Sequence, residues 1–161
     1  MIIRKIKNEE FNEAMKLALD VYMEFEAPDC GEEGVKTFIK DIIKNENFKN
    51  AVYSGENRIW GAFIEDKLVG LIGMRGESHI CLVFTHKEYH RKGIATKIMN
   101  TVISDIRKEN PNVKSITLNS SPYGVPFYHK FGFVDTDCEQ LKNGIRYTPM
   151  IYLLEEEDGC N

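Results

Sequence analysis

The chain has 161 residues, 42% of them hydrophobic, which is enough to form one domain with a substantial apolar core. Its formal net charge is -4, with 21 basic and 25 acidic residues, which argues against general nucleic-acid binding through phosphate neutralisation. The four cysteines show neither zinc-site nor disulfide spacing, and no uncharged run approaches the roughly 18 residues of a membrane span, so we expect a cytoplasmic protein with no metal and no membrane partner.

The N-terminal third reads as a strand followed by two helices. Residues 2–7 are short and β-branched, and Asn8 can cap a helix whose apolar positions recur at helical spacing as far as Phe25. A break at residues 27–31 ends that helix, and an apolar stripe over residues 35–43 predicts a second one.

Three strands and a long helix are predicted in the middle of the chain. Residues 58–65 and 68–75 are separated by the polar pair Asp66-Lys67, which indicates a hairpin, and residues 78–85 form the third strand. A helix is expected at residues 93–109, with apolar side chains along one face.

The C-terminal part of the sequence is predicted to form a strand, a short helix and a long strand. These elements occupy residues 115–119, residues 125–131, which Gly132 ends, and residues 145–155. The acidic residues that follow are expected to fray. The order β-α-α-β-β-β-α-β-α-β(-β), in which the last segment supplies one strand or two, predicts an α+β fold in which helices flank a mixed central β-sheet.

The helix at residues 93–109 begins without a conventional side-chain cap. The first turn of a helix has unpaired N–H groups and the positive end of the macrodipole, which together bind phosphate. Gly93 and the small Ala95 let a ligand approach the backbone closely, and Arg91 and Lys92 add full charges. A pyrophosphate could therefore be held mainly by main-chain donors, although an ordinary basic turn would look similar.

Two stretches together resemble the GNAT superfamily of N-acetyltransferases. Residues 90–95, His-Arg-Lys-Gly-Ile-Ala, match the family's Gln/Arg-x-x-Gly-x-Gly/Ala acetyl-CoA motif, with His90 where Gln or Arg is usual. Residues 127–133, Phe-Tyr-His-Lys-Phe-Gly-Phe, match its Phe-Tyr-x-Lys-x-Gly-Phe signature. The resemblance implies a GNAT-like fold, with a single N-acetyltransferase domain at residues 1–154 and an acidic tail at residues 155–161.

The resemblance also implies that acetyl-CoA is the co-substrate. In this family the strand before the first motif splays from its neighbour, the pantetheine arm bonds to the free strand edge, and the pyrophosphate meets the amides that follow. The implied cofactor-binding residues are Val83, Phe84, Thr85, Arg91, Lys92, Gly93, Ile94, Ala95, Thr96 and Asn119, with Ser121 as an alternative to Asn119.

By the same resemblance, Tyr128 is the expected catalytic residue. When an amine attacks a thioester, a thiolate must depart, and a hydrogen-bond donor near the sulfur eases its departure. Pro126 fits best in the first turn of a helix, which would place Tyr128 near a helix start beside the sheet. The alternative is an aromatic side chain that only packs on the sheet.

An acidic cluster surrounds the break between the first two predicted helices, in a region that borders the acceptor cleft in this family. Its members are Glu24, Glu26, Asp29, Glu32 and Glu33. It could attract a cationic amine and accept its proton through water, with Glu24 and Glu26 as candidate substrate-binding residues, or be a solvated surface. His79 and His86 are alternative bases, and Cys81 is expected to be a small core residue rather than an acyl carrier.

We therefore expect an acetyl-CoA-dependent N-acetyltransferase that transfers the acyl group directly to a primary amine, most simply of a small molecule. A peptide or protein amine is the second option within the enzyme interpretation. The alternative outside it is a non-catalytic acetyl-CoA-binding sensor, and the presence of Tyr128 favours the enzyme. A homodimer is left open as the assembly state.

Overall fold

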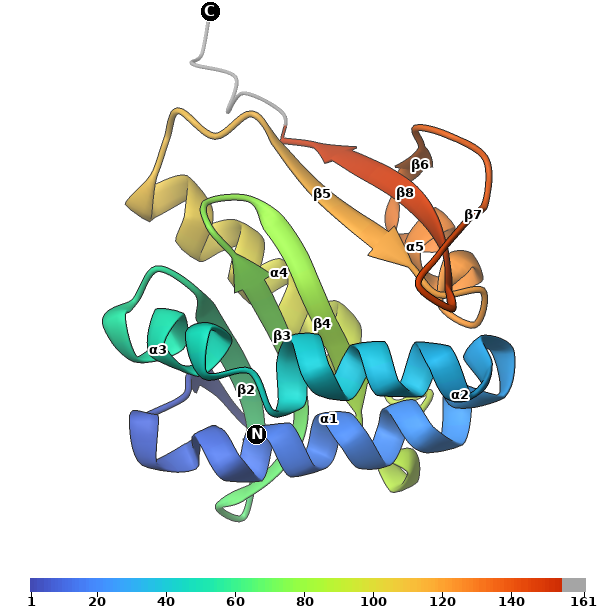
Figure 1. Ribbon diagram of the computed structural model, residues 1–161. Coiled ribbons are helices and arrows are strands. Elements are labelled where there is room, and N and C mark those ends of the chain that lie inside the picture. The colour runs from blue at the N-terminus through green and yellow to red at the C-terminus, as the bar shows by residue number, and fades with distance from the viewer. Residues whose placement is uncertain (155–161) are drawn as a thin grey trace, which may run out of the picture.

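The computed structural model describes residues 1–154, and the expected acidic tail at residues 155–161 lies outside them. The strands form one sheet in the order β1-β2-β3-β4-β5-β8-β6, with β7 paired to β8 (Figure 1). Helices α1, α2 and α3 cover one face of the sheet, and α4 and α5 cover the other. This arrangement confirms the predicted α+β architecture with a mixed central sheet.

The strands are β1 Ile2–Lys5, β2 Arg58–Ile64, β3 Lys67–Arg75, β4 His79–Thr85, β5 Ser115–Ser120, β6 Val134–Asp135, β7 Gln140–Lys142 and β8 Ile145–Leu153. The α-helices are α1 Phe11–Phe25, α2 Ala27–Phe38, α3 Glu46–Ser54, α4 Ile94–Glu109 and α5 Val125–Phe131. Short turns of 3-10 helix occupy Asn8–Glu10 and Lys87–Tyr89, and a π-helical turn, Ile39–Ile43, continues α2. Within residues 1–154, no helix combines the length and apolar character needed to cross a membrane.

Helix α3 was not predicted from the sequence. The Asn45 side chain caps it by accepting a hydrogen bond of 2.8 Å from the Phe48 amide, and Gly55 ends it in the left-handed conformation. Only Phe48 and Val52 of this nine-residue helix are buried, so its apolar pattern is too short to identify a helix from the sequence. The two caps were the available signal.

The expected break at residues 27–31 is wrong in its extent. Helix α2 begins at Ala27 with Pro28 in its first turn, where proline is tolerated because that turn's N–H has no helical acceptor. The interruption is confined to Gly31, whose φ of 65° is not helical. The predicted hairpin is confirmed, since Glu65 and Asp66, with φ values of 50° and 65°, form the tight turn between β2 and β3.

Strand β4 contains a bulge that changes which way its side chains face. Met74 of β3 pairs with Ile80, but Gly73 pairs with Leu82, so Cys81 is an extra residue in β4. Ile80 accordingly packs in the core under α4, whereas Leu82 packs in the core under α1.

The pairing between β4 and β5 ends at this bulge. The two strands are parallel, and their register contains only His79 with Thr117 and Ile80 with Leu118. Strand β5 continues alongside β8 as far as Ser120, so the sheet opens after Ile80 like a V between β4 and β5 (Figure 1). Residues 81–85 therefore present a strand edge that β5 does not cover.

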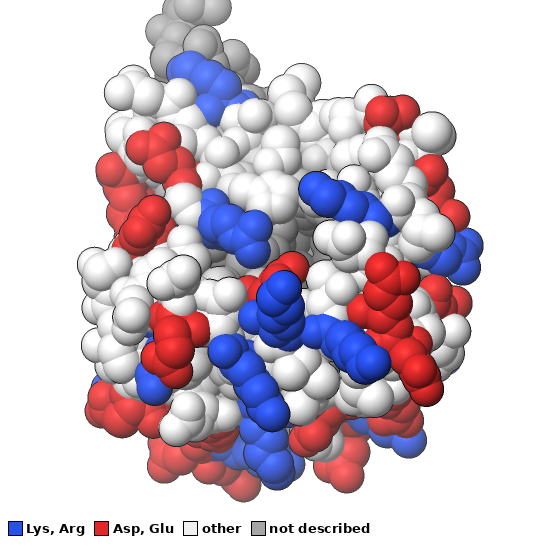
Figure 2. All heavy atoms as spheres, in the orientation of Figure 1, with Lys and Arg blue, Asp and Glu red and all other residues white. Residues whose placement is uncertain are grey.

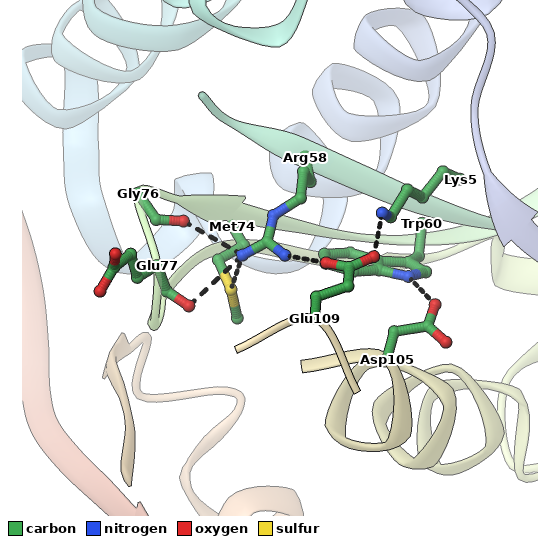
Figure 3. A network of polar contacts seen from close by, with 8 residues as sticks. All are labelled: Lys5, Arg58, Trp60, Met74, Gly76, Glu77, Asp105 and Glu109. Atoms are coloured by element: carbon green, nitrogen blue, oxygen red, sulfur yellow. Dashed lines mark hydrogen bonds and ion pairs between the residues drawn. The ribbon is translucent and has the colours of Figure 1, made fainter. Parts of the chain in front are cut away.

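A polar network fixes the C-terminal end of α4 against β1 and β2 (Figure 3). The indole N–H of the fully buried Trp60 donates to Asp105 at 2.8 Å. Glu109 forms ion pairs with both Lys5 and Arg58 (Figure 3). Because this end of α4 is tied to the sheet, its opposite end is held at the opening between β4 and β5.

The Trp60–Asp105 bond can be tested with the fluorescence of the single tryptophan of the chain. We expect Asp105→Ala to lower the free energy of unfolding in urea by about 1–3 kcal/mol, because it leaves a buried N–H without an acceptor. Asp105→Asn keeps an acceptor oxygen and should lose less than half as much. Wild-type unfolding midpoints for both variants would show that the bond does not stabilise the fold.

Candidate active site

Two cavities lie at the opening between β4 and β5. The larger cavity has a volume of about 940 Å³ and is lined by the end of β4, the start of α4 and by α5. The smaller cavity, about 410 Å³, lies among α2, β4 and the β7–β8 hairpin. They share a boundary formed by Glu26, Val83, Phe84, Ser121 and Tyr128.

The N-terminal end of α4 faces the larger cavity with its amides free of helical partners. Gly93 starts the helix in the left-handed conformation, at φ 74°, and no side chain caps it. The first backbone bond runs from the Lys97 amide to the Gly93 carbonyl at 3.0 Å, so the amides of residues 94–96 have no acceptor within the helix. A Cβ placed on Gly93 would meet no protein atom within 4 Å. This open, positively polarised helix end has the properties of an anion site.

The residues around this helix start take different roles. Arg91 lines the larger cavity, whereas the ammonium group of Lys92 lies 5.3 Å from the centre of the Tyr89 ring and is outside the lining. His90 donates from Nε2 to the Thr85 carbonyl at 2.6 Å. His90 thus secures the turn to the end of β4, and the Thr85 carbonyl is already engaged.

The structure places the two candidate polar residues, Asn119 near the end of β5 and Ser121 just after it, at different cavities. Asn119 is exposed and lines only the smaller cavity. Ser121 lines both cavities, where its hydroxyl accepts from the Gly124 amide at 3.2 Å and donates to Glu26. Ser121, the alternative to Asn119 in the sequence interpretation, is therefore the one at the larger cavity.

Tyr128 is both a core residue and a wall of the two cavities. It lies in α5, with Pro126 in the first turn as expected, and its side chain is only 8% exposed. Its ring packs edge-on against Phe133, with centroids 5.6 Å apart. Burial, and secondarily the charge of Glu26, raise the pKa of the phenol well above its usual range. The hydroxyl is therefore protonated at any physiological pH and can donate a hydrogen bond.

Glu26 brings a titratable carboxyl to the same boundary. It lies at the junction of α1 and α2, and burial raises its pKa to about 7, an effect that the hydrogen bond from Ser121 opposes and the charge of Asp29 increases. Such a group exchanges protons readily near neutral pH. In the sequence it could not be told apart from its acidic neighbours.

The rest of the expected acidic cluster does not enter either cavity. Glu24 is exposed and forms an ion pair of 2.8 Å with Lys87. The exposed Asp29, Glu32 and Glu33 line neither cavity. These four residues therefore fit the solvated-surface interpretation. Glu26 is the member of the acidic cluster that lines the cavities.

The alternative bases and the cysteine also have identifiable positions. His79 lines the smaller cavity, its Nδ1 lies 2.9 Å from the Thr117 hydroxyl, and burial and then the charge of Arg75 lower its pKa. The ring of His86 accepts from the Glu88 amide at 3.2 Å and so caps a short turn. Burial raises the pKa of the Cys81 thiol to about 11, which leaves it un-ionised and a poor nucleophile.

Several cavity residues were not predicted from the sequence. The larger cavity is also lined by Phe25, Asn100, Tyr123, Lys130, Phe131 and Tyr152. Phe25 and Tyr123, whose ring centroids are 5.2 Å apart, bring the end of α1 against the loop after β5. Lys130 and Phe131 lie inside the second motif and could have been proposed from it, whereas the contact of Phe25 depends on tertiary packing.

Comparison with known proteins identifies the family. The model of the Acetyltransferase (GNAT) domain matches residues 26–154. The uncharacterized N-acetyltransferase YafP of Escherichia coli (strain K12) is 28% identical over 78 residues, which cover 48% of this chain and 47% of YafP. The similarity therefore spans about half the length of this curated relative.

Solved structures show the same fold. A GCN5-related N-acetyltransferase from Rhodopseudomonas palustris superposes with a TM-score of 0.80 at 19% identity, covering 95% of each chain. The PaiA N-acetyltransferase of Thermoplasma acidophilum, crystallised with coenzyme A, gives a TM-score of 0.77 at 20% identity over 95% of this chain and 98% of that one. The match of the family model to most of the chain, together with this fold, shows that the chain belongs to the GNAT acetyltransferase family.

Proposed function

We propose that this chain is an acetyl-CoA-dependent N-acetyltransferase that transfers the acetyl group directly to the primary amine of a small molecule. The observation that carries the proposal is the meeting of two cavities at Glu26 and Tyr128, where β4 parts from β5. In this proposal the larger cavity takes the donor, and the smaller cavity takes the acceptor.

The larger cavity has the features that coenzyme A requires. Free amides at the start of α4 suit a pyrophosphate, and the space over Gly93 allows a close approach. The uncovered edge of residues 83–85 can bond an amide-containing arm, except at the Thr85 carbonyl, which His90 occupies. The coenzyme A bound by the similar PaiA enzyme supports the same ligand here.

In the proposed reaction, two residues at the boundary between the cavities have different roles: Glu26 accepts a proton, and Tyr128 donates a hydrogen bond. Acetyl-CoA supplies a thioester, whose carbonyl an amine attacks and whose sulfur leaves as a thiolate. Glu26, with its pKa of about 7, accepts a proton from the amine, directly or through water. Tyr128 stays protonated and donates a hydrogen bond toward the departing sulfur. The proposal has direct transfer without an acyl-cysteine, because burial raises the pKa of the half-buried Cys81 thiol to about 11 and makes it a poor nucleophile.

The shape of the smaller cavity favours a small acceptor over a peptide. The tip of the β7–β8 hairpin is fastened to α2, where the Thr37 hydroxyl donates to the Asn143 carbonyl at 2.8 Å. Beside this bond, a Cβ on Gly34 would lie only 2.7 Å from the Gly144 carbonyl oxygen. Thr37 and Asn143 both line the smaller cavity, so this contact forms one of its walls. A peptide would have to displace it.

The proposal is tested by incubating the protein with acetyl-CoA and a panel of amines and measuring thiol release. Release that depends on one or more small amines supports it. Tight binding of coenzyme A without release by any amine would favour the sensor alternative. Release by peptide amines alone would favour a peptide or protein acceptor.

The anion site at α4 predicts that Gly93→Ala weakens coenzyme A binding at least tenfold, which is about 1.4 kcal/mol. The added Cβ would occupy the open space next to the amides. Because φ is 74°, the substitution also strains the backbone by roughly 1–2 kcal/mol. Isothermal calorimetry measures the affinity, and thermal denaturation measures the strain.

Gly55→Ala is the matched control for this strain. Gly55 has a φ of 86°, no atom within 4 Å of its Cβ position and a location at the end of α3. It should lose similar stability and keep wild-type affinity. Equal affinities for the wild type and both variants would place the pyrophosphate elsewhere.

The role of Tyr128 predicts that Tyr128→Phe lowers kcat by roughly 10²–10⁴-fold, the usual contribution of a general acid. Phenylalanine keeps the ring that packs on Phe133, so the affinity for coenzyme A should stay within a few-fold. Steady-state kinetics with calorimetry separates the two effects. Tyr53→Phe, at an exposed tyrosine of α3, is the control for loss of a hydroxyl. A near-wild-type rate for Tyr128→Phe would disprove the assignment.

The role of Glu26 predicts a pH-dependent effect of Glu26→Gln. The ratio of wild-type to variant kcat/KM should rise with pH up to about 7 and stay constant above it, because only the carboxylate accepts a proton. Taking the ratio cancels the ionisation of the amine itself. A ratio that does not change between pH 5 and 9 would exclude Glu26 as the base.

The same variant provides a check without substrate. The pKa of Glu26 is raised on folding, from 4.5 to about 7, so the folded state binds more protons than the unfolded state between these values. The wild type should therefore lose stability as pH rises through this window, whereas Glu26→Gln should not. Above about pH 8 the variant should be more stable, by up to about 3 kcal/mol in urea unfolding.

A further inference from the structure

The smaller cavity has a basic side that the proposed chemistry leaves unused. Arg75 enters its lining from the end of β3, and Lys142 enters from the β7–β8 hairpin. We propose that the acceptor carries, in addition to its amine, a carboxylate or phosphate group that binds Arg75, while Lys142 adds positive charge to the same cavity. This inference rests on the proposed function and specifies its substrate class.

Arg75 and Lys142 are available for a ligand. Within residues 1–154, neither side chain has a hydrogen bond or an ion pair, whereas the side chain of the neighbouring Arg146 is bound to Glu139 by contacts of 3.1–3.3 Å. The acidic residues in the lining are Asp41 and Glu26, and the raised pKa of Glu26 leaves it only partly charged near neutral pH. The lining therefore carries a positive excess.

The positive excess is local. The chain as a whole has a net charge of -4, yet Lys and Arg side chains gather around the hollow at the centre of the face shown in Figure 2. Within the cavity wall, burial and then the charge of Arg75 lower the pKa of His79, and the same charge opposes the rise in the pKa of Cys81 that burial causes. The field of the guanidinium thus acts on the interior of the cavity.

The geometry places the reacting amine and Arg75 at different ends of the smaller cavity. Arg75 pairs with His79 at the start of β4, and Val83 lies at the boundary with the larger cavity. Four residue steps along a strand span ~13 Å. The long Arg75 side chain can extend from its end of the cavity toward the boundary, which shortens this distance. An acceptor whose amine and anion are several bonds apart can therefore reach from Glu26 to Arg75.

The chemistry of the lining selects among amines. A guanidinium and an ammonium bind a carboxylate or phosphate by charge-assisted hydrogen bonds. A diamine would bring a second cation against the same two groups and be repelled. An amine with a neutral tail would leave both cations without a partner.

The test compares 6-aminohexanoate, 6-amino-1-hexanol and 1,6-diaminohexane, which share one chain length and differ in terminal charge. We expect kcat/KM for the aminohexanoate to exceed that for the aminoalcohol at least tenfold, with the diamine lowest. An aminoalkyl phosphate of similar length distinguishes a phosphate from a carboxylate as the preferred group. Equal values across the panel, or a preference for the diamine, would overturn the inference while leaving the proposed function intact.

Substitution of the two cations separates them from the catalytic residues. Arg75→Ala and Lys142→Ala should each reduce kcat/KM for the aminohexanoate several-fold, and together at least tenfold, with the aminoalcohol rate within about two-fold of wild type. Arg107→Ala, an exposed cation near the C-terminal end of α4, removes the same charge outside the cavity and should change neither. Equal losses for both substrates in the double variant would show a structural role and contradict the inference.

A binding measurement does not depend on turnover. Coenzyme A lacks the acetyl group, so the protein saturated with it forms a complex with the amine that cannot react. The aminohexanoate should raise the melting temperature of this complex, and the rise should disappear in the double variant. No rise in the wild type would overturn the inference. If coenzyme A binds but no amine in any panel releases thiol, the proposed function fails, and this inference fails with it.

Discussion

The loss of hydrogen bonding between β4 and β5 after Ile80 is the constraint on which the rest of the site depends. The extra residue Cys81 in β4 changes the strand's direction at the point where the pairing ends. An uncovered strand edge is normally an aggregation hazard. Here it becomes the wall of two cavities, because helices cover both faces of the sheet and the loop after β5, with Ser121, Tyr123 and Gly124, lines the larger cavity. The bulge therefore links a local backbone irregularity to the two cavities in which we propose that the donor and the acceptor bind.

Helix α4 is joined to the sheet near its C-terminal end and leaves amides without helical partners at its N-terminal end. Near its C-terminal end, Asp105 accepts a hydrogen bond from Trp60 of the sheet, and Glu109 pairs with Lys5 and Arg58. These contacts fix the position and orientation of the helix on the sheet. Its N-terminal turn has no cap, so its amides remain available for an anion. The cost of an uncapped helix end is tolerated because packing of the buried apolar face holds the helix in place.

The boundary between the cavities places two acidic groups with different proton affinities beside each other. Burial raises the pKa of both, but Glu26 reaches about 7 and Tyr128 moves far above neutrality. One group can therefore accept a proton under conditions in which the other can only donate a hydrogen bond. Arg75 and Lys142 in the lining of the smaller cavity extend this division, since we propose that their charges attract the part of the acceptor that does not react.

The sequence by itself determined the α+β order, the β2–β3 hairpin and the exposed helix start at Gly93, because each follows from local periodicity, turn chemistry or a missing cap. It missed α3, whose apolar pattern is too short. Only the tertiary structure decided which acidic residue enters the cavities: Glu26 and Glu24 are equivalent in sequence, yet Glu26 is half-buried beside Ser121 and Glu24 pairs with Lys87 at the surface. The exposure of a side chain and the charges around it depend on segments that are distant in the sequence and pack together only in the folded chain. A local sequence pattern therefore cannot predict them.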